Sequence, residues 1–173
     1  MTNDLPLFAP LDPLHVEGKV TRWDVVVCAR AWIGTPYQHQ HRARGIGVDC
    51  AGLVIGVARD LGLVAADFDV TGYAPTPDGT TLIAECDRWM RRIHVWDLRP
   101  GNVLVVNFGR RSGFKPQHMG IVGDYMHGGL SLIQALGTAD GKGEVIESRL
   151  HERSGWRHVQ GYELPGIFEP GAA

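Results

Sequence analysis

Residues 49–58 read Asp-Cys-Ala-Gly-Leu-Val-Ile-Gly-Val-Ala, and this stretch decides the predicted fold. From Cys50 to Leu61, apolar residues recur at the spacing of successive helical turns. The pattern predicts a mostly buried helix. Asp49 is the expected N-cap, which places Cys50 at the first helical position, and Gly62 is expected to close the far end.

A cysteine at the start of a helix is a candidate nucleophile. The unpaired backbone N–H groups of the first turn and the positive end of the helix dipole both stabilise a thiolate. An unperturbed thiol has a pKa of about 8.5 and is only slightly ionised at neutral pH. We therefore expect this position to activate Cys50; a buried cysteine that only packs is the alternative.

Two further helices are predicted from apolar spacing, over residues 23–33 and 81–93. The first is stopped by Gly-Thr-Pro at residues 34–36. Cys28 and Cys86 fall inside these helices and are expected to pack in the core. Three widely spaced cysteines argue against a disulfide framework. The second helix should bury one stripe of side chains, formed by Leu82, Cys86, Trp89, Met90 and Ile93.

After these helices the apolar pattern changes to that of strands. Turns rich in Gly and Pro separate five candidate strands, at residues 102–108, 118–122, 130–135, 144–148 and 159–164. Helices followed by a meander of antiparallel strands indicate an α+β fold. Prolines at three positions predict an extended arm over residues 1–20, followed by a single domain over residues 21–173.

A histidine and a glutamine stand out within the predicted strands. His118 opens an apolar strand, which it could simply cap, and Gln134 is a polar amide inside the run Leu-Ile-Gln-Ala. If the hairpin between them is centred near Met126, Gln134 lies opposite His118 and can bond to the imidazole. We therefore predict His118 as a base and Gln134 as the group that orients it; a Gln134 bonded to backbone is the alternative.

Composition argues against several classes of function. The formal net charge of -2 provides no broad cationic surface, so nucleic-acid binding is not expected. No apolar run reaches the roughly 18 residues of a spanning helix, so membrane insertion is not expected. Residues 1–13 lack the pattern of a signal peptide, so we expect synthesis in the cytoplasm without one.

Four short segments, taken together, carry a family resemblance. They are Gly-Thr-Pro-Tyr at 34–37, Asp-Cys-Ala-Gly-Leu-Val at 49–54, Pro-Gly-Asn at 100–102 and His-Met-Gly-Ile-Val at 118–122. In order and spacing they resemble the NlpC-type family of papain-like cell-wall cysteine peptidases. Residues 32–40 are more particularly similar to peptidases encoded with phage-tail or gene-transfer-particle genes.

The resemblance implies a papain-like α+β fold, with the nucleophile at the start of a buried helix packed on a five- to six-stranded antiparallel sheet. It implies hydrolysis of peptidoglycan stem peptides between D-glutamate and the diamino acid, by a Cys50 nucleophile and a His118 base. Tyr37 would stabilise the oxyanion together with the Cys50 backbone N–H, and Asp49 would line the substrate's amino end. No cofactor and no metal are implied.

The implied partners are the stem peptide and, for the phage-tail subgroup, proteins of the tail or tail-like particle. Such a particle would carry the enzyme to the cell wall or periplasm. The sequence departs from the family pattern at three positions: Ala51 replaces a small hydroxyl residue, Asn102 replaces an acid, and Gln134 stands where a second histidine is usual. The last departure bears on the residue that orients His118.

The sequence leaves three alternatives open. His39 and His41 are spaced to bind a metal together with Cys50 and His118. The chain could instead be a catalytically silent tail or hub component that docks through its proline-containing arm. A thioester can also be resolved by an amine or an alcohol, which would make the protein a thiol-dependent acyltransferase.

Overall fold

Helix α2 (Cys50–Asp60) is mostly buried and has the boundaries that its sequence predicts. Asp49 is the N-cap, and its side chain accepts a hydrogen bond from the backbone N–H of Gly52 at 2.7 Å. Gly62, with a φ of 67°, terminates the helix in the left-handed region that glycine tolerates best. The computed structural model describes residues 19–75, 78–108, 115–138, 141–150 and 156–169. Most of the predicted arm, residues 1–18, lies outside these ranges.

Helix α1 (Arg22–Arg30) is shorter than predicted at its C-terminal end. A capping box fixes its start, because the Thr21 side chain accepts from the backbone N–H of Asp24 and the Asp24 carboxylate accepts from the backbone N–H of Thr21. Cys28 is half-buried, and its thiol lies 3.9 Å from a carboxylate oxygen of Asp60. It packs against the main hydrophobic core without being fully buried, so the prediction that Cys28 is a core residue is confirmed in part.

Helix α3 (Thr81–Trp89) ends four residues before the predicted boundary. Met90 is extended, with φ of -130° and ψ of 156°, and Arg91–Ile93 form strand β3. The chain leaves the helix because β3 pairs with a strand at residues 161–163, a partner that helical periodicity cannot reveal. Cys86 is buried as predicted, whereas Trp89 is 42% exposed and not part of the core.

Six antiparallel strands form the main sheet, in the order β3-β8-β4-β5-β6-β7. All five predicted strands are confirmed, and β4 to β7 form the expected meander. The last strand does not extend the meander but returns to pair with β4 and β3. Two short strands, β1 (Arg42–Ala43) and β2 (Gly47–Val48), pair separately. The remaining strands are β4 (Val103–Phe108), β5 (His118–Asp124), β6 (Leu130–Gly137), β7 (Gly143–Arg149) and β8 (Trp156–Glu163).

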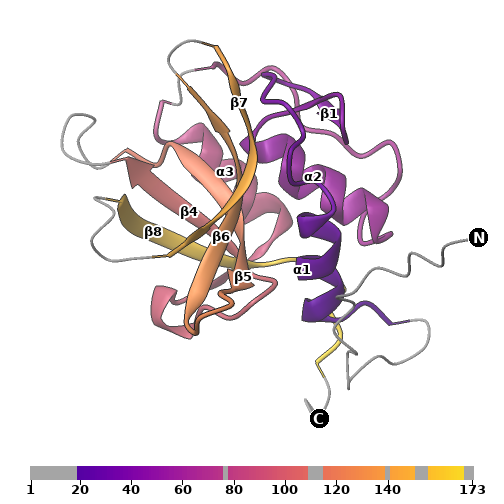
Figure 1. Ribbon diagram of the computed structural model, residues 1–173, viewed down its shortest axis with the longest axis vertical. Coiled ribbons are helices and arrows are strands. Elements are labelled where there is room, and N and C mark those ends of the chain that lie inside the picture. The colour runs from indigo at the N-terminus through magenta and orange to yellow at the C-terminus, as the bar shows by residue number, and fades with distance from the viewer. Residues whose placement is uncertain (1–18, 76–77, 109–114, 139–140, 151–155, 170–173) are drawn as a thin grey trace, which may run out of the picture.

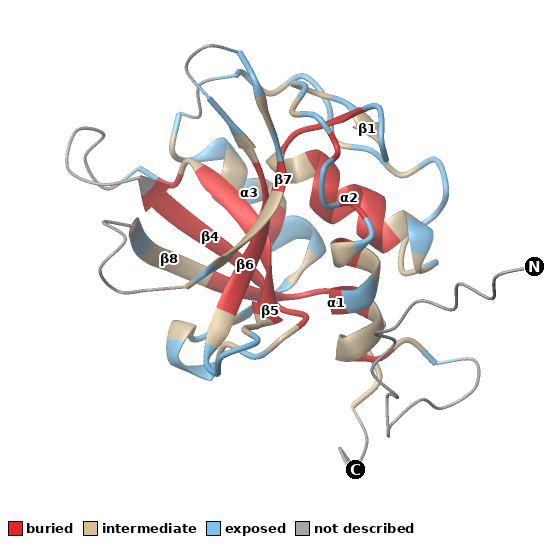
Figure 2. Ribbon diagram, in the orientation of Figure 1, coloured by how far each residue is buried: buried red, intermediate tan, exposed pale blue. Residues whose placement is uncertain are grey.

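The helices pack against one face of this sheet, and Figure 1 shows α1 and α2 together beside it, on the right of the view. The larger core contains residues of α1, α2 and α3 together with inward-facing residues of the strands, such as Val105, Ile121 and Ile133. A smaller core on the other face contains Leu104 and Leu132, next to a 3-10 turn, η1 (Val95–Asp97). Figure 2 shows the buried residues concentrated in the central strands and in α2. The helix that begins with Cys50 is thus held on the sheet by the main core.

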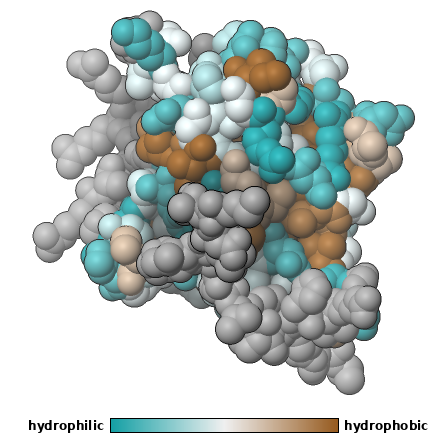
Figure 3. Space-filling view, turned by 45° about the vertical axis from the view of Figure 1, so that its right-hand side comes forward, coloured by the Kyte–Doolittle hydropathy of each residue, from teal (hydrophilic) through white to brown (hydrophobic). Residues whose placement is uncertain are grey.

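Hydrophobic residues that remain exposed are scattered over the surface. The exposed large side chains include Ile46, Trp96 and Met126. On the face seen in Figure 3, hydrophobic surface occurs in patches separated by hydrophilic areas. Among the described residues, none of the helices combines the length and apolar character that crossing a membrane would require.

Candidate active site

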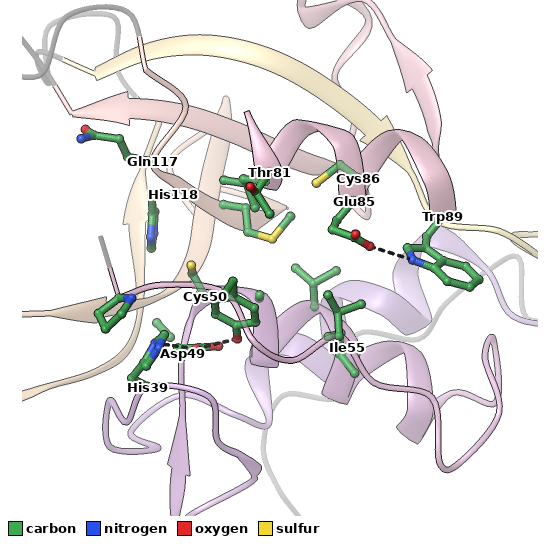
Figure 4. Close-up of a pocket in the computed structure, with 18 of the residues that line it drawn as sticks. His39, Asp49, Cys50, Ile55, Thr81, Glu85, Cys86, Trp89, Gln117 and His118 are labelled. Atoms are coloured by element: carbon green, nitrogen blue, oxygen red, sulfur yellow. Dashed lines mark hydrogen bonds and ion pairs between the residues drawn. The ribbon is translucent and has the colours of Figure 1, made fainter. Parts of the chain in front are cut away.

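A groove of about 730 Å³ opens between α2 and α3 and contains most of the predicted site residues. Cys50 at the start of α2 and His118 at the start of β5 both line it, and Figure 4 shows the two side chains adjacent within it. Tyr37 and Asp49 line the same end. Gln134 is fully buried and contacts His118 from behind. The structure thus gathers five residues that are spread over almost a hundred positions of sequence.

The imidazole of His118 is held by a buried hydrogen bond. Its Nε2 lies 2.9 Å from Oε1 of Gln134, and Nε2 of Gln134 donates to the hydroxyl of Ser148 at 3.1 Å. Since the amide nitrogen is engaged by Ser148, its oxygen faces the ring, so Nε2 of His118 is the protonated nitrogen. In the neutral ring Nδ1 is then the nitrogen that can accept a proton.

The predicted contact between Gln134 and His118 is confirmed, but the predicted register is not. The hairpin aligns Asp124 with Leu130, so its midpoint is one residue later than the predicted centre at Met126. Continuing this register places Gln134 opposite Gly120, diagonally related to His118. The contact forms because a glutamine side chain is long enough to reach a diagonal neighbour.

The thiol of Cys50 is not ionised at rest. Burial raises its pKa to about 11, and the negative charge of Asp49 acts in the same direction. The backbone N–H groups of Met119, Ala51 and Cys50 itself lower the pKa, but their effect is smaller. The expectation that the start of a helix activates Cys50 by stabilising a resting thiolate is therefore wrong, because desolvation outweighs the helix.

His118 is likewise neutral at rest. Burial lowers the pKa of its imidazole to about 4, while the hydrogen bond to Gln134 and the charge of Asp49 oppose this shift. The resting pair is consequently a thiol beside an uncharged base. Such a pair reacts by moving the thiol proton to the imidazole as the sulfur attacks, instead of beginning as an ion pair.

Tyr37 lies close to the nucleophile and stays protonated. Burial, followed by the negative charges that Cys50 and Asp49 can carry, raises the pKa of its phenol to about 12. Its ring packs against the backbone of Gly137, where the Cβ of any larger residue would lie 3.0 Å from the ring. A tyrosine that keeps its proton can donate a hydrogen bond to a developing oxyanion.

Asp49 is a buried junction between α2 and the loop that precedes it. One carboxylate oxygen accepts from the N–H of Gly52, and the other accepts from the N–H of Gln40 and the hydroxyl of Tyr73, each at 2.7 Å. Arg42 approaches the first oxygen to 3.4 Å. Only glycine fits at position 52, because a Cβ there would lie 2.3 Å from a backbone carbonyl of this loop. These contacts hold the loop against the nucleophile; binding of a substrate amine by Asp49 stays a prediction.

The residues of the proposed metal site are not gathered around one point. His39 lies 3.4 Å from Asp49 and against the ring of Tyr73, whereas His41 is exposed and contacts the backbone carbonyl of His39. The described residues contain no group of three or more His, Cys, Asp or Glu side chains arranged to hold a metal ion.

Three residues of the site do not emerge from the sequence. Ser148 orients the amide of Gln134, while Arg42 and Tyr73 bind each other and Asp49. The Arg42 side chain is only 7% exposed and also pairs with Asp69. Ser148 could have been found only with the correct strand register, since it lies in the strand beside Gln134. A buried arginine in a polar loop gives no signal of its own.

Solved structures share this fold at low sequence identity. A crystal structure of an N-acetylmuramoyl-L-alanine amidase from Bacteroides uniformis at 1.15 Å resolution aligns with a TM-score of 0.52 and 12% identity, covering 83% of this chain and 98% of that one. A second structure with the same description, at 1.07 Å, gives a TM-score of 0.50 and 13% identity over the same shares. No family model matches the sequence, and no curated protein matches it. This likeness establishes a common α+β fold.

Proposed function

We propose that this protein is a papain-like cysteine peptidase of the NlpC type that hydrolyses an amide bond in peptidoglycan stem peptides. The bond is the one between D-glutamate and the diamino acid, as the four matching sequence segments imply. Cys50 is the nucleophile, His118 the base, and Gln134 the residue that orients the base. No cofactor takes part in this chemistry.

The observation that carries the proposal is the arrangement of Cys50 and His118 in one groove. The cysteine is fixed by a buried helix, and the histidine is fixed by a hydrogen bond of 2.9 Å to Gln134. Nucleophile, base and orienting group come from three different elements, α2, β5 and β6, and supply the three roles of a thiol-based catalytic triad. A cysteine that served only to pack would need no such histidine.

The reaction begins with both groups uncharged. The sulfur of Cys50 attacks the carbonyl carbon while its proton passes to Nδ1 of His118, and the carbonyl oxygen becomes an oxyanion. The backbone N–H of Cys50 and the hydroxyl of Tyr37 donate to that oxygen. His118 then protonates the leaving amine as the C–N bond breaks, and water hydrolyses the thioester with His118 again accepting a proton.

The structural neighbours support a wall amide as the substrate. Both are described as N-acetylmuramoyl-L-alanine amidases, a name that places their scissile amide in peptidoglycan. Their bond differs from the one proposed here, so cleavage between the muramoyl group and L-alanine is a second candidate reaction for the same site.

Digestion of defined muropeptides tests both reactions. Wild-type protein and Cys50→Ala are incubated with intact muropeptides, and the fragments are identified by mass spectrometry. We expect cleavage between D-glutamate and the diamino acid, absent from Cys50→Ala. Release of the whole stem peptide would favour the amidase reaction, and transfer to an added amine would identify an acyltransferase. Intact muropeptides with both proteins would support the silent structural component.

We also propose that the enzyme is delivered by a phage tail or tail-like particle. The resemblance of residues 32–40 to phage-tail peptidases supports this. Deletion of residues 1–20 should then abolish co-purification with tail proteins while leaving cleavage of free muropeptides intact. Equal co-purification of the full-length and shortened proteins would contradict a docking role for the arm.

A further inference from the structure

The groove continues beyond Cys50 as an apolar channel between α2 and α3. Its α2 side is formed by Val54, Ile55 and Ala58, and its far end by Phe68 and Trp89, whose rings meet edge to face at 4.7 Å. From Cys50 to Ala58 the helix advances about 12 Å. A ligand group that leaves the reacting bond in this direction is therefore surrounded by aliphatic and aromatic surface.

One carboxylate interrupts this apolar lining. Glu85 projects from α3 into the space between the two helices, as Figure 4 shows. The indole N–H of Trp89, one turn further along α3, donates to Oε2 of Glu85 at 3.2 Å. This bond orients the carboxylate along the groove. An ionised carboxylate can accept several hydrogen bonds, so Glu85 can accept one from a ligand while it accepts one from Trp89.

The other charged groups of the groove do not compete for this position. Asp49 is paired with Arg42, and Asp78 caps the start of α3 by accepting three hydrogen bonds from Thr80 and Thr81. No Lys or Arg of the described residues lines the groove. Arg88 instead lies over the Trp89 ring, 5.0 Å from its centroid. Glu85 thus gives the channel a negative charge within apolar surroundings.

We propose that the channel binds an aliphatic side chain that ends in a primary ammonium, with Glu85 as its counter-ion. The methylene stem packs on the α2 side, and the ammonium donates a charge-assisted hydrogen bond to the Glu85 carboxylate at the open side of the channel. Glu85 is then a specificity-determining residue and Trp89 positions it. If the function proposed above holds, on which this identification rests, the side chain is that of the diamino acid.

Binding of two small ligands tests this inference without catalysis. Cys50→Ala protein is titrated with Nα-acetyl-lysine amide and with Nα-acetyl-norleucine amide, which has an aliphatic stem but no ammonium, and binding is followed by NMR. We expect the lysine compound to bind about tenfold more tightly. Adding Glu85→Gln should remove the difference and leave norleucine binding unchanged. Asp97→Asn, which removes a charge in η1, should preserve it.

Three results would overturn the inference: equal affinity for the two compounds, a difference that survives Glu85→Gln, or no binding of either compound. A separate result would show that the proposed function is wrong, namely that protein containing Cys50 leaves muropeptides intact. Binding of the ammonium compound would still be valid in that case. Conversely, if Glu85→Gln slows cleavage of lysine- and norleucine-containing stem peptides equally, the function stands and the assignment of Glu85 is wrong.

Discussion

The two sides of the groove are built in opposite ways. The closed wall, formed by α2 and β5, contains seven consecutive buried residues of α2 at positions 52–58 and a buried N-cap at Asp49. The open wall, formed by α3, buries only Cys86 among its side chains, and its start is capped by the exposed Asp78 instead of by the N-cap residue Thr80. The reacting groups lie on the closed wall and the proposed ligand-binding carboxylate on the open one. Chemistry that needs fixed geometry is thus separated from binding that tolerates adjustment.

The largest expected effect is on the closed wall, from removing the thiol. Cys50→Ala should reduce amide hydrolysis by a factor of about 10⁴ or more, because Cys86, the other thiol that lines the groove, is buried in the main core. Cys28→Ala, a thiol on α1 outside the groove, should keep wild-type activity. The activity of both variants is measured with muropeptides by mass spectrometry. Equal activity of the two variants would contradict the assignment of Cys50 as the nucleophile.

The second-largest expected effect is a difference in stability between substitutions on the two walls. Asp49→Ala removes the cap of α2 and leaves the N–H of Gln40 and the Tyr73 hydroxyl without their acceptor, so we expect a loss of about 3 kcal/mol in the free energy of unfolding. Thr80→Ala on the open wall should cost about 0.5 kcal/mol or less. Urea denaturation monitored by circular dichroism measures both. Similar losses would mean that the two helices are held equally firmly.

The same contrast explains how much of the molecule its sequence predicts. The limits of α2 were predictable because Asp49 and Gly62 act locally on the chain. The end of α3 was not, since β3 depends on pairing with residues about seventy positions away. Gln134 was recognisable as a polar residue that needs a partner in an apolar strand, whereas Ser148 required the exact strand pairing. The predicted direction of the pKa shift of Cys50 was also wrong, because burial depends on the tertiary structure and outweighs the local effect of the helix.

A third effect tests how completely the closed wall excludes water. Burial lowers the pKa of His118 to about 4, from about 6.5 in an unfolded chain. As the pH falls from 6.5 to 4, the unfolded chain gains a proton at this site before the folded protein does. The stability that neutral His118 contributes above pH 6.5 is therefore lost between pH 6.5 and 4. The free energy of unfolding falls by about 3 kcal/mol because of this residue.

Urea denaturation at several pH values measures this loss. His118→Gln removes the titrating group, so its stability should fall less steeply between pH 6.5 and 4 than that of the wild type. The other histidines and carboxylates contribute equally to both proteins and cancel in the comparison. Parallel pH profiles would show that His118 titrates normally and that this part of the wall is open to water.

The smallest effect concerns Ser148, which contacts neither the thiol nor the groove. Without its hydroxyl the amide of Gln134 can rotate and present Nε2 to the imidazole, which favours the tautomer that carries its proton on Nδ1. That tautomer cannot accept the thiol proton. We expect Ser148→Ala to lower kcat about tenfold with KM unchanged, and Gln134→Ala to lower it further. A change in KM alone would contradict this role and would mean that Ser148 shapes the substrate site instead of positioning the base. The residues that position the base would then not be separate from those that bind the substrate.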